Sequence, residues 1–113
     1  AIPDTIELYT GDGIARMVVP STLDGLNLLS INAHVFTAGS SGPNTIMMHN
    51  QTIGQDMLTT PVTVEVSEVD SSTSSTPAVT SAYNKVTEAD VLRIDVDAIS
   101  TGAKGLEIRM TFR

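Results

Sequence analysis

Residues 90–113 constrain the fold more than any other stretch, because polar and apolar side chains alternate there in two consecutive runs. The apolar positions are Leu92, Ile94, Val96 and Ala98 in the first run, and Leu106, Ile108, Met110 and Phe112 in the second. Successive side chains of a β-strand point to opposite faces, so each run predicts a strand with one apolar face. A helix would need apolar spacings of three and four, which neither run has. Two such runs joined by a loop that contains two glycines predict an antiparallel hairpin.

A second hairpin is predicted near the start of the sequence. Residues 5–9 alternate as a short strand, and residues 14–19 can return as its partner. The dipeptide Asp12-Gly13 between them is typical of a tight hairpin turn. Pro20 ends the second strand, because proline has no N–H group to donate to a ladder.

The rest of the chain predicts further short strands. They fall in residues 26–37, 45–50 and 62–66, with residues 56–58 either a strand or one helical turn, and residues 77–83 a weakly pairing segment. The Ser/Thr run at 71–76 is interpreted as a loop within the domain, since strands flank it. About eight short strands separated by turn residues predict an all-β, single-domain antiparallel β-sandwich over residues 1–113. A jelly roll is the simplest such architecture, and an immunoglobulin-like sandwich is the alternative.

Composition narrows the classes of partner. Six basic and thirteen acidic residues give a net charge of -7, which repels phosphate backbones, so no nucleic-acid partner is expected. Aromatic residues make up 4% and tryptophan is missing, which disfavours a stacking surface for sugars or bases. The sequence has no cysteine for disulfides or thiolate metal sites. No apolar run approaches the length of a membrane span, so no membrane partner is expected.

Two histidines and a pair of aspartates are the first candidates for chemistry. His34 and His49 stand opposite the cleaner apolar faces of their strands, and on neighbouring strands they could bind a metal or titrate together. The favoured interpretation is two ordinary strand histidines, since no third ligand has motif spacing. Asp95 and Asp97 share a strand face and could hold calcium.

Arginines near these aspartates favour a different interpretation of them. Arg93 shares their face, and Arg109 and Arg113 can lie across the predicted hairpin. Cross-strand charge pairs, worth roughly 0.2–1 kcal/mol each, explain this pattern more simply than a calcium site.

The remaining acidic and hydroxyl side chains predict no catalytic site. Glu65, Glu68, Asp70 and Asp56 could form a cation site, although a solvated acidic rim is the favoured interpretation. The serines and threonines have no nucleophile-elbow motif, and the glycine-rich turn at residues 10–13 lacks the lysine of a phosphate loop. We therefore expect no enzyme activity, no cofactor and no metal.

Three segments carry a resemblance to a known group of proteins. They are Asp56–Thr60 (DMLTT), Leu92–Asp97 (LRIDVD) and Thr101–Leu106 (TGAKGL). With them, the chain resembles small virion proteins of tailed bacteriophages of the jelly-roll type, over roughly residues 6–112. Members of this group look like capsid decoration (cement) proteins, head fibres or tail-appendage modules, and the resemblance includes no catalytic residues.

The resemblance implies a structural role in the virion, which assembles in the host cytoplasm. The expected function is that of a capsid decoration protein that binds and stabilises the assembled phage head as a trimer. Its expected partners are the major capsid protein and further copies of itself. A receptor- or carbohydrate-binding module of a fibre or tail appendage is the alternative.

Three residues are candidates for contacts with partners. Met47 stands beside Met48, so one of the two must leave the core face, and Met47 is predicted to be exposed at a subunit contact. Residues 1–4 contain Ile2 and Pro3 without a strand pattern that would bury them. They are predicted to form an extended N-terminal arm whose Ile2 fills a pocket on a neighbour.

Overall fold

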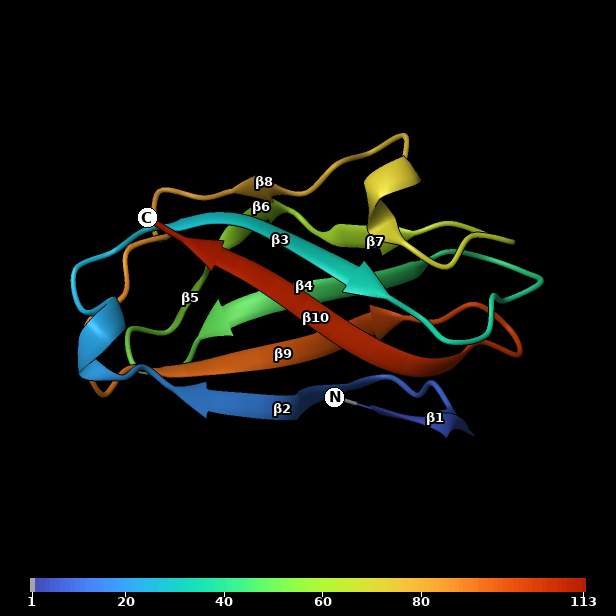
Figure 1. Cartoon of the computed structure of the whole chain (residues 1–113), viewed down its shortest axis with the longest axis horizontal. Helices are drawn as coiled ribbons and strands as arrows, with labels where there is room; N and C mark the ends of the chain where they lie inside the picture. Colours follow the sequence, from blue (N-terminus) through green and yellow to red (C-terminus); the bar gives the residue numbers. More distant parts are fainter. Residues whose placement is uncertain (1) are drawn as a thin grey trace.

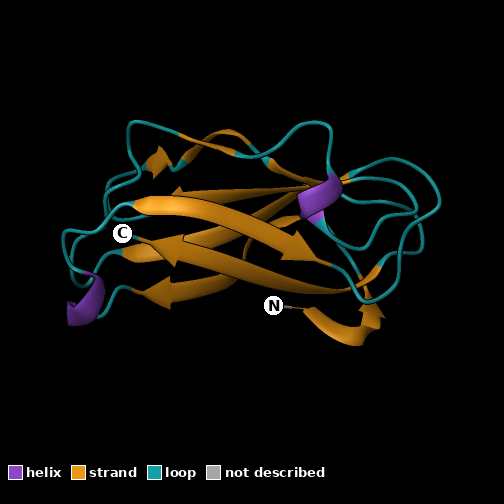
Figure 2. Cartoon of the chain, turned by 45° about the horizontal axis from the view of Figure 1, so that its top comes forward, coloured by secondary structure: helices purple, strands orange, loops and turns teal. Residues whose placement is uncertain are grey.

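The computed structural model describes residues 2–113, which form ten β-strands and two short 3-10 helices. Figure 1 shows them along the chain, and Figure 2 shows the same elements from another side. The strands are β1 (Ile2–Glu7), β2 (Gly11–Val18), β3 (Leu28–His34), β4 (Asn44–Asn50), β5 (Gln55–Asp56), β6 (Leu58–Thr60), β7 (Val62–Val64), β8 (Val79–Thr80), β9 (Val91–Ala98) and β10 (Lys104–Phe112). The helices are η1 (Ser21–Leu23) and η2 (Ser71–Thr73).

The strands form two antiparallel sheets that pack face to face. One sheet has the order β1-β10-β3, and the other has the order β2-β9-β4-β5, with β7 also paired to β4. Strands β6 and β8 form a small third pair. The predicted all-β antiparallel sandwich is confirmed, and it encloses one hydrophobic cluster to which both sheets contribute.

The order of pairing is that of a jelly roll. Strand β1 pairs with β10, β2 with β9 and β4 with β7, while β3 contacts β8, so the partners are nested as in one long hairpin that has been rolled up. An immunoglobulin sandwich instead places its last two strands side by side in one sheet. Here β9 and β10 belong to different sheets, which distinguishes the two architectures.

Both predicted hairpins are wrong. Strands β1 and β2 do not pair with each other, and neither do β9 and β10, because each of these connections crosses from one sheet to the other. Alternation determines which face of a strand is apolar but not which strand lies beside it. The apolar faces of β9 and β10 meet across the core, where Leu92 and Leu106 are fully buried. Asp12-Gly13 lies inside β2, where Gly13 has a φ of 70° at a bulge in the β2·β9 ladder.

The segment that the sequence left open, residues 56–58, and the Ser/Thr run that it placed in a loop within the domain are both ordered parts of the sandwich. Residues 55–60 form β5 and β6 with Met57 fully buried between them, and the Met57 N–H donates to the Met48 carbonyl at 2.8 Å. The Ser/Thr run contains η2, whose buried Ser71 accepts a hydrogen bond from the Ala33 N–H at 2.9 Å through its Oγ. This loop therefore packs within the domain.

The predicted N-terminal arm is wrong for residues 2–4, and Ala1 lies outside the described residues. Ile2 begins β1, pairs with Leu106 of β10 and is only 1% exposed. Pro3 is exposed in the same strand, where an edge position tolerates proline. The prediction failed because an edge strand needs backbone pairing and can form without regular alternation.

Membrane-spanning helices are not found: within residues 2–113 no helix has the length and apolar character to cross a bilayer.

Candidate interaction surface

Four loops meet at one end of the sandwich, on the right in Figure 1. We call residues 8–10, 35–43, 65–70 and 99–103 the loop end. Backbone hydrogen bonds join its loops: Leu8 N to Ala103 O at 2.9 Å, Val35 N to Val69 O at 2.7 Å, Ser67 N to Gly39 O at 3.0 Å, and Ser40 N to Thr101 O at 2.9 Å. These bonds satisfy backbone groups that loops otherwise leave to water, so the four loops form one connected surface.

Large apolar side chains are exposed on every loop of the loop end. They are Tyr9, Phe36, Val66, Val69 and Ile99. Phe36 is 64% exposed, more than any other large apolar side chain of residues 2–113. Apolar groups on exposed loops are typical of contact surfaces, because covering them releases hydrating water.

The backbone around Phe36 fixes its outward position. Its N–H donates to the Lys104 carbonyl at 2.9 Å, which joins the end of β3 to the start of β10. Gly105 passes directly beneath with a φ of 73°, and a Cβ there would lie 2.9 Å from the Phe36 Cβ and 3.0 Å from the Asp4 Cα. Glycine is therefore required where β1, β10 and the Phe36 loop meet.

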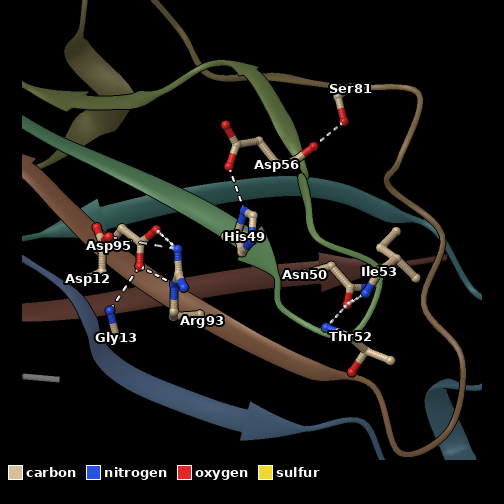
Figure 3. A network of polar contacts seen from close by, with 10 residues as sticks. All are labelled: Asp12, Gly13, His49, Asn50, Thr52, Ile53, Asp56, Ser81, Arg93 and Asp95. Carbon is tan, nitrogen blue, oxygen red and sulfur yellow. Dashed lines mark hydrogen bonds and ion pairs between the residues drawn. The ribbon is translucent and has the colours of Figure 1, made fainter.

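A polar network covers the outer face of the sheet that contains β9 (Figure 3). The Arg93 guanidinium donates to both carboxylate oxygens of Asp95, at 2.7 and 2.9 Å, and reaches Asp12 at 4.0 Å. Asp95 is only 5% exposed and also accepts from the Gly13 N–H at 2.9 Å. The hydrogen bonds to Asp95 raise the pKa of Arg93. This cluster joins β9 to β2 and has the character of a structural ion pair.

The charge pairing predicted for the aspartates is confirmed in part. Asp95 pairs with Arg93, but Arg109 and Arg113 cannot lie across a hairpin from them, since β10 belongs to the other sheet. Burial raises the pKa of Asp97, and the charges of Asp95, Asp12 and Asp56 raise it further. Asp97 is thus held among like charges.

The two histidines lie in different sheets, so the structure does not bring them together. His49 of β4 has its Nδ1 2.7 Å from Asp56 Oδ1, and His34 of β3 has its Nδ1 3.2 Å from Asp70 Oδ2. The Ser72 N–H, which donates to Asp70, is the main cause of the lowered pKa of that carboxyl. Each histidine therefore has its own carboxylate.

The second predicted acidic group is also dispersed. Glu65 accepts from the Ser75 hydroxyl at 2.7 Å, while Glu68 accepts from the Thr73 hydroxyl at 3.2 Å. Across residues 2–113, no three histidine or acidic side chains are grouped closely enough to hold a metal ion.

The residues predicted to contact partners have different positions from those expected. Ile2 is in the core, Pro3 is exposed on β1, and Met47 is half-buried on the outer face of β4 opposite Asp95. Met47 also packs against the core cluster, so it is less exposed than predicted. The sequence does not predict the loop end, because Phe36 and Val66 fall in the predicted strands 26–37 and 62–66, whereas β3 ends at His34 and β7 at Val64.

Comparison with known proteins gives no relative: no protein-family model matches the chain, and neither a curated protein nor a solved structure matches it significantly.

Proposed function

We propose that this chain is a virion structural protein, a capsid decoration protein that binds the assembled phage head as a trimer and stabilises it. The single observation that carries the proposal is the loop end, where hydrogen-bonded loops present Phe36 and four other large apolar side chains to solvent. The jelly-roll order of the strands and the resemblance of the segments at residues 56–60, 92–97 and 101–106 to phage virion proteins support it as well.

The mechanism is bridging by many copies. Each domain places its loop end against a seam between neighbouring capsomers, and three domains in one trimer hold several capsid subunits together. Burial of one large apolar side chain such as Phe36 contributes roughly 1.5–3 kcal/mol. Three contacts in one trimer hold it on the capsid far better than a single contact would, because the second and third contacts form at high effective concentration once the first has formed.

The test uses purified heads that lack decoration protein, and two variants that place the same charge at equally exposed apolar positions. Phe36→Asp alters the loop end, whereas Val18→Asp alters β2, where Val18 is 63% exposed. The native chain and Val18→Asp are expected to co-sediment with the heads, whereas Phe36→Asp is expected not to. Bound heads are expected to break at a higher temperature than bare heads. Equal binding by both variants would exclude the loop end as the contact.

The oligomeric state is tested separately by sedimentation equilibrium of the isolated protein. A trimer is expected at tens of micromolar, roughly the range of a weak interface. A strict monomer at that concentration would contradict the trimer.

Glycan binding is a further readout in the same experiment. The exposed Tyr9 and Tyr83 precede the antiparallel strands β2 and β9, so they lie at opposite ends of the sandwich and form no common stacking platform. Glycan-array binding that depends on either tyrosine would replace the capsid proposal with a receptor-binding one.

A further inference from the structure

One edge of strand β10 is unpaired over most of its length. Among residues 2–113, strand β1 covers this edge through the register pairs Glu7–Lys104 and Ile2–Leu106. Beyond them, from residue 107 to 112, β10 pairs only with β3, on its other side. Within the described part of the chain, no strand occupies the free side. Alternate N–H and C=O groups of this stretch therefore lack a strand partner, which makes the edge a template for an added strand.

An apolar slot opens beside the same edge, between the two sheets. It has a volume of about 180 Å³. Its apolar lining is Ala15 and Met17 of β2, Leu92 and Ile94 of β9, and Ile108 and Met110 of β10. Ile108 and Met110 point inward yet remain half-buried, because β2 and β10 belong to different sheets and no strand among residues 2–113 bridges them here. The methionines lining the slot can adapt to side chains of different shapes.

We infer that this edge and slot form a docking site for an extended β-strand of a partner polypeptide, which adds to β10 and inserts alternate apolar side chains between the sheets. The unpaired backbone requires a strand, since a helix would leave the β10 groups unsatisfied. The pairing of β1 fixes its direction, because a strand that continues β1 along β10 is antiparallel to β10. The inference is independent of the proposed capsid role.

Charge defines the other face of the partner strand. Arg109 is exposed on the outward side of β10, and the exposed Arg113 follows directly after the strand, against one acidic residue on the same side of β10, Glu107. Two of the six basic residues of a chain with a net charge of -7 thus lie along this stretch. The complementary partner has apolar residues at every second position and acidic residues between them. Opposite-charge pairs across neighbouring strands stabilise such an addition.

The probe is a blocked seven-residue peptide of alternating glutamate and valine, compared with a peptide of the same composition in which the valines are consecutive. Backbone amide exchange of the native protein is followed by NMR as peptide is added, up to about 1 mM. In residues 107–112, the amides directed away from β3 are expected to exchange fast in the free protein. They should become at least about tenfold slower with the alternating peptide, since exchange then requires the strand to dissociate.

Two variants locate the site. Met110→Glu places a carboxylate in the slot and is expected to weaken peptide binding more than about tenfold, because the buried charge lacks a partner. Val79→Glu makes the same kind of change at a half-exposed position of β8 and should leave binding unchanged. The exchange measurement on the native protein decides the matter even if Met110→Glu fails to fold. The inference is overturned by unchanged exchange in residues 107–112, by equal binding of both peptides, or by protection that rises with protein concentration alone, which would make a second copy the occupant.

Discussion

Replacement of Ile2 by alanine tests whether the N-terminal residues belong to the sandwich. Ile2 is 1% exposed, lies in the core cluster and pairs with Leu106, although the sequence predicts a free arm at this position. If Ile2 is part of the core, its truncation must destabilise the isolated domain. If it belongs to an arm, truncation must leave stability unchanged.

The expected magnitude follows from burial. Truncation from isoleucine to alanine removes about three methylene equivalents, each worth about 0.8 kcal/mol when buried, or about 2.4 kcal/mol in total. The cavity that remains adds to this, so the free energy of unfolding is expected to fall by about 2–5 kcal/mol. For a domain of this size that corresponds to roughly 4 °C in Tm per kcal/mol.

The assay is urea unfolding followed by circular dichroism, together with a thermal scan. Ile6→Ala is the matched control, since Ile6 lies in the same strand but is 47% exposed. It is expected to cost less than about 1 kcal/mol. Equal and near-zero effects of the two substitutions would refute the burial of Ile2 and would indicate that residues 2–4 form an arm.

Three further predictions concern single positions. Gly105→Ala should destabilise the fold by about 2 kcal/mol or more, because a side chain at a φ of 73° is strained and also collides with Phe36, as measured by urea unfolding. Arg93→Met should lower the free energy of unfolding in the same assay, since it leaves the buried carboxylate of Asp95 without its cation. Asp97→Asn should raise the Tm at pH 7: a folded-state pKa above the usual 3.8 means that the ionised carboxylate destabilises the fold, and this gain should shrink as pH falls through the raised pKa.

Each of these predictions has a control in the chain. Gly102, in the loop that precedes β10, has a φ of 82° but open space around it, so Gly102→Ala isolates the backbone strain and should cost less than Gly105→Ala. Arg16→Met removes an exposed arginine and should have little effect. Glu7→Gln neutralises an exposed carboxylate of β1 and should not reproduce the pH dependence of Asp97→Asn. If a control substitution changed stability as much as the substitution it is matched to, the structural reason given for that prediction would be contradicted.

The class of fold and the orientation of most strand side chains follow from the pattern of residues along the chain. The alternation in β9 correctly predicted the buried face of Leu92, Ile94 and Val96, and the sequence correctly kept Met48 on the core face of β4. These predictions succeeded because side-chain direction along a strand is a local property of the backbone with a period of two. The pairing of Asp95 with Arg93 was also accessible, since residues two apart on a strand share a face.

The choice of strand partners, and with it the position of the candidate surfaces, depends on how the whole chain packs. Strands pair through backbone N–H and C=O groups. Every residue carries a C=O group, and every residue except proline carries an N–H group, so a sequence pattern does not identify the neighbour of a strand. The rolled-up order of the jelly roll separates β9 from β10 and places Ile2 beside Leu106, and no strand of residues 2–113 pairs with the rest of that β10 edge. The same order brings loops from residues 8–10, 35–43, 65–70 and 99–103 to one end, although they are far apart in the chain.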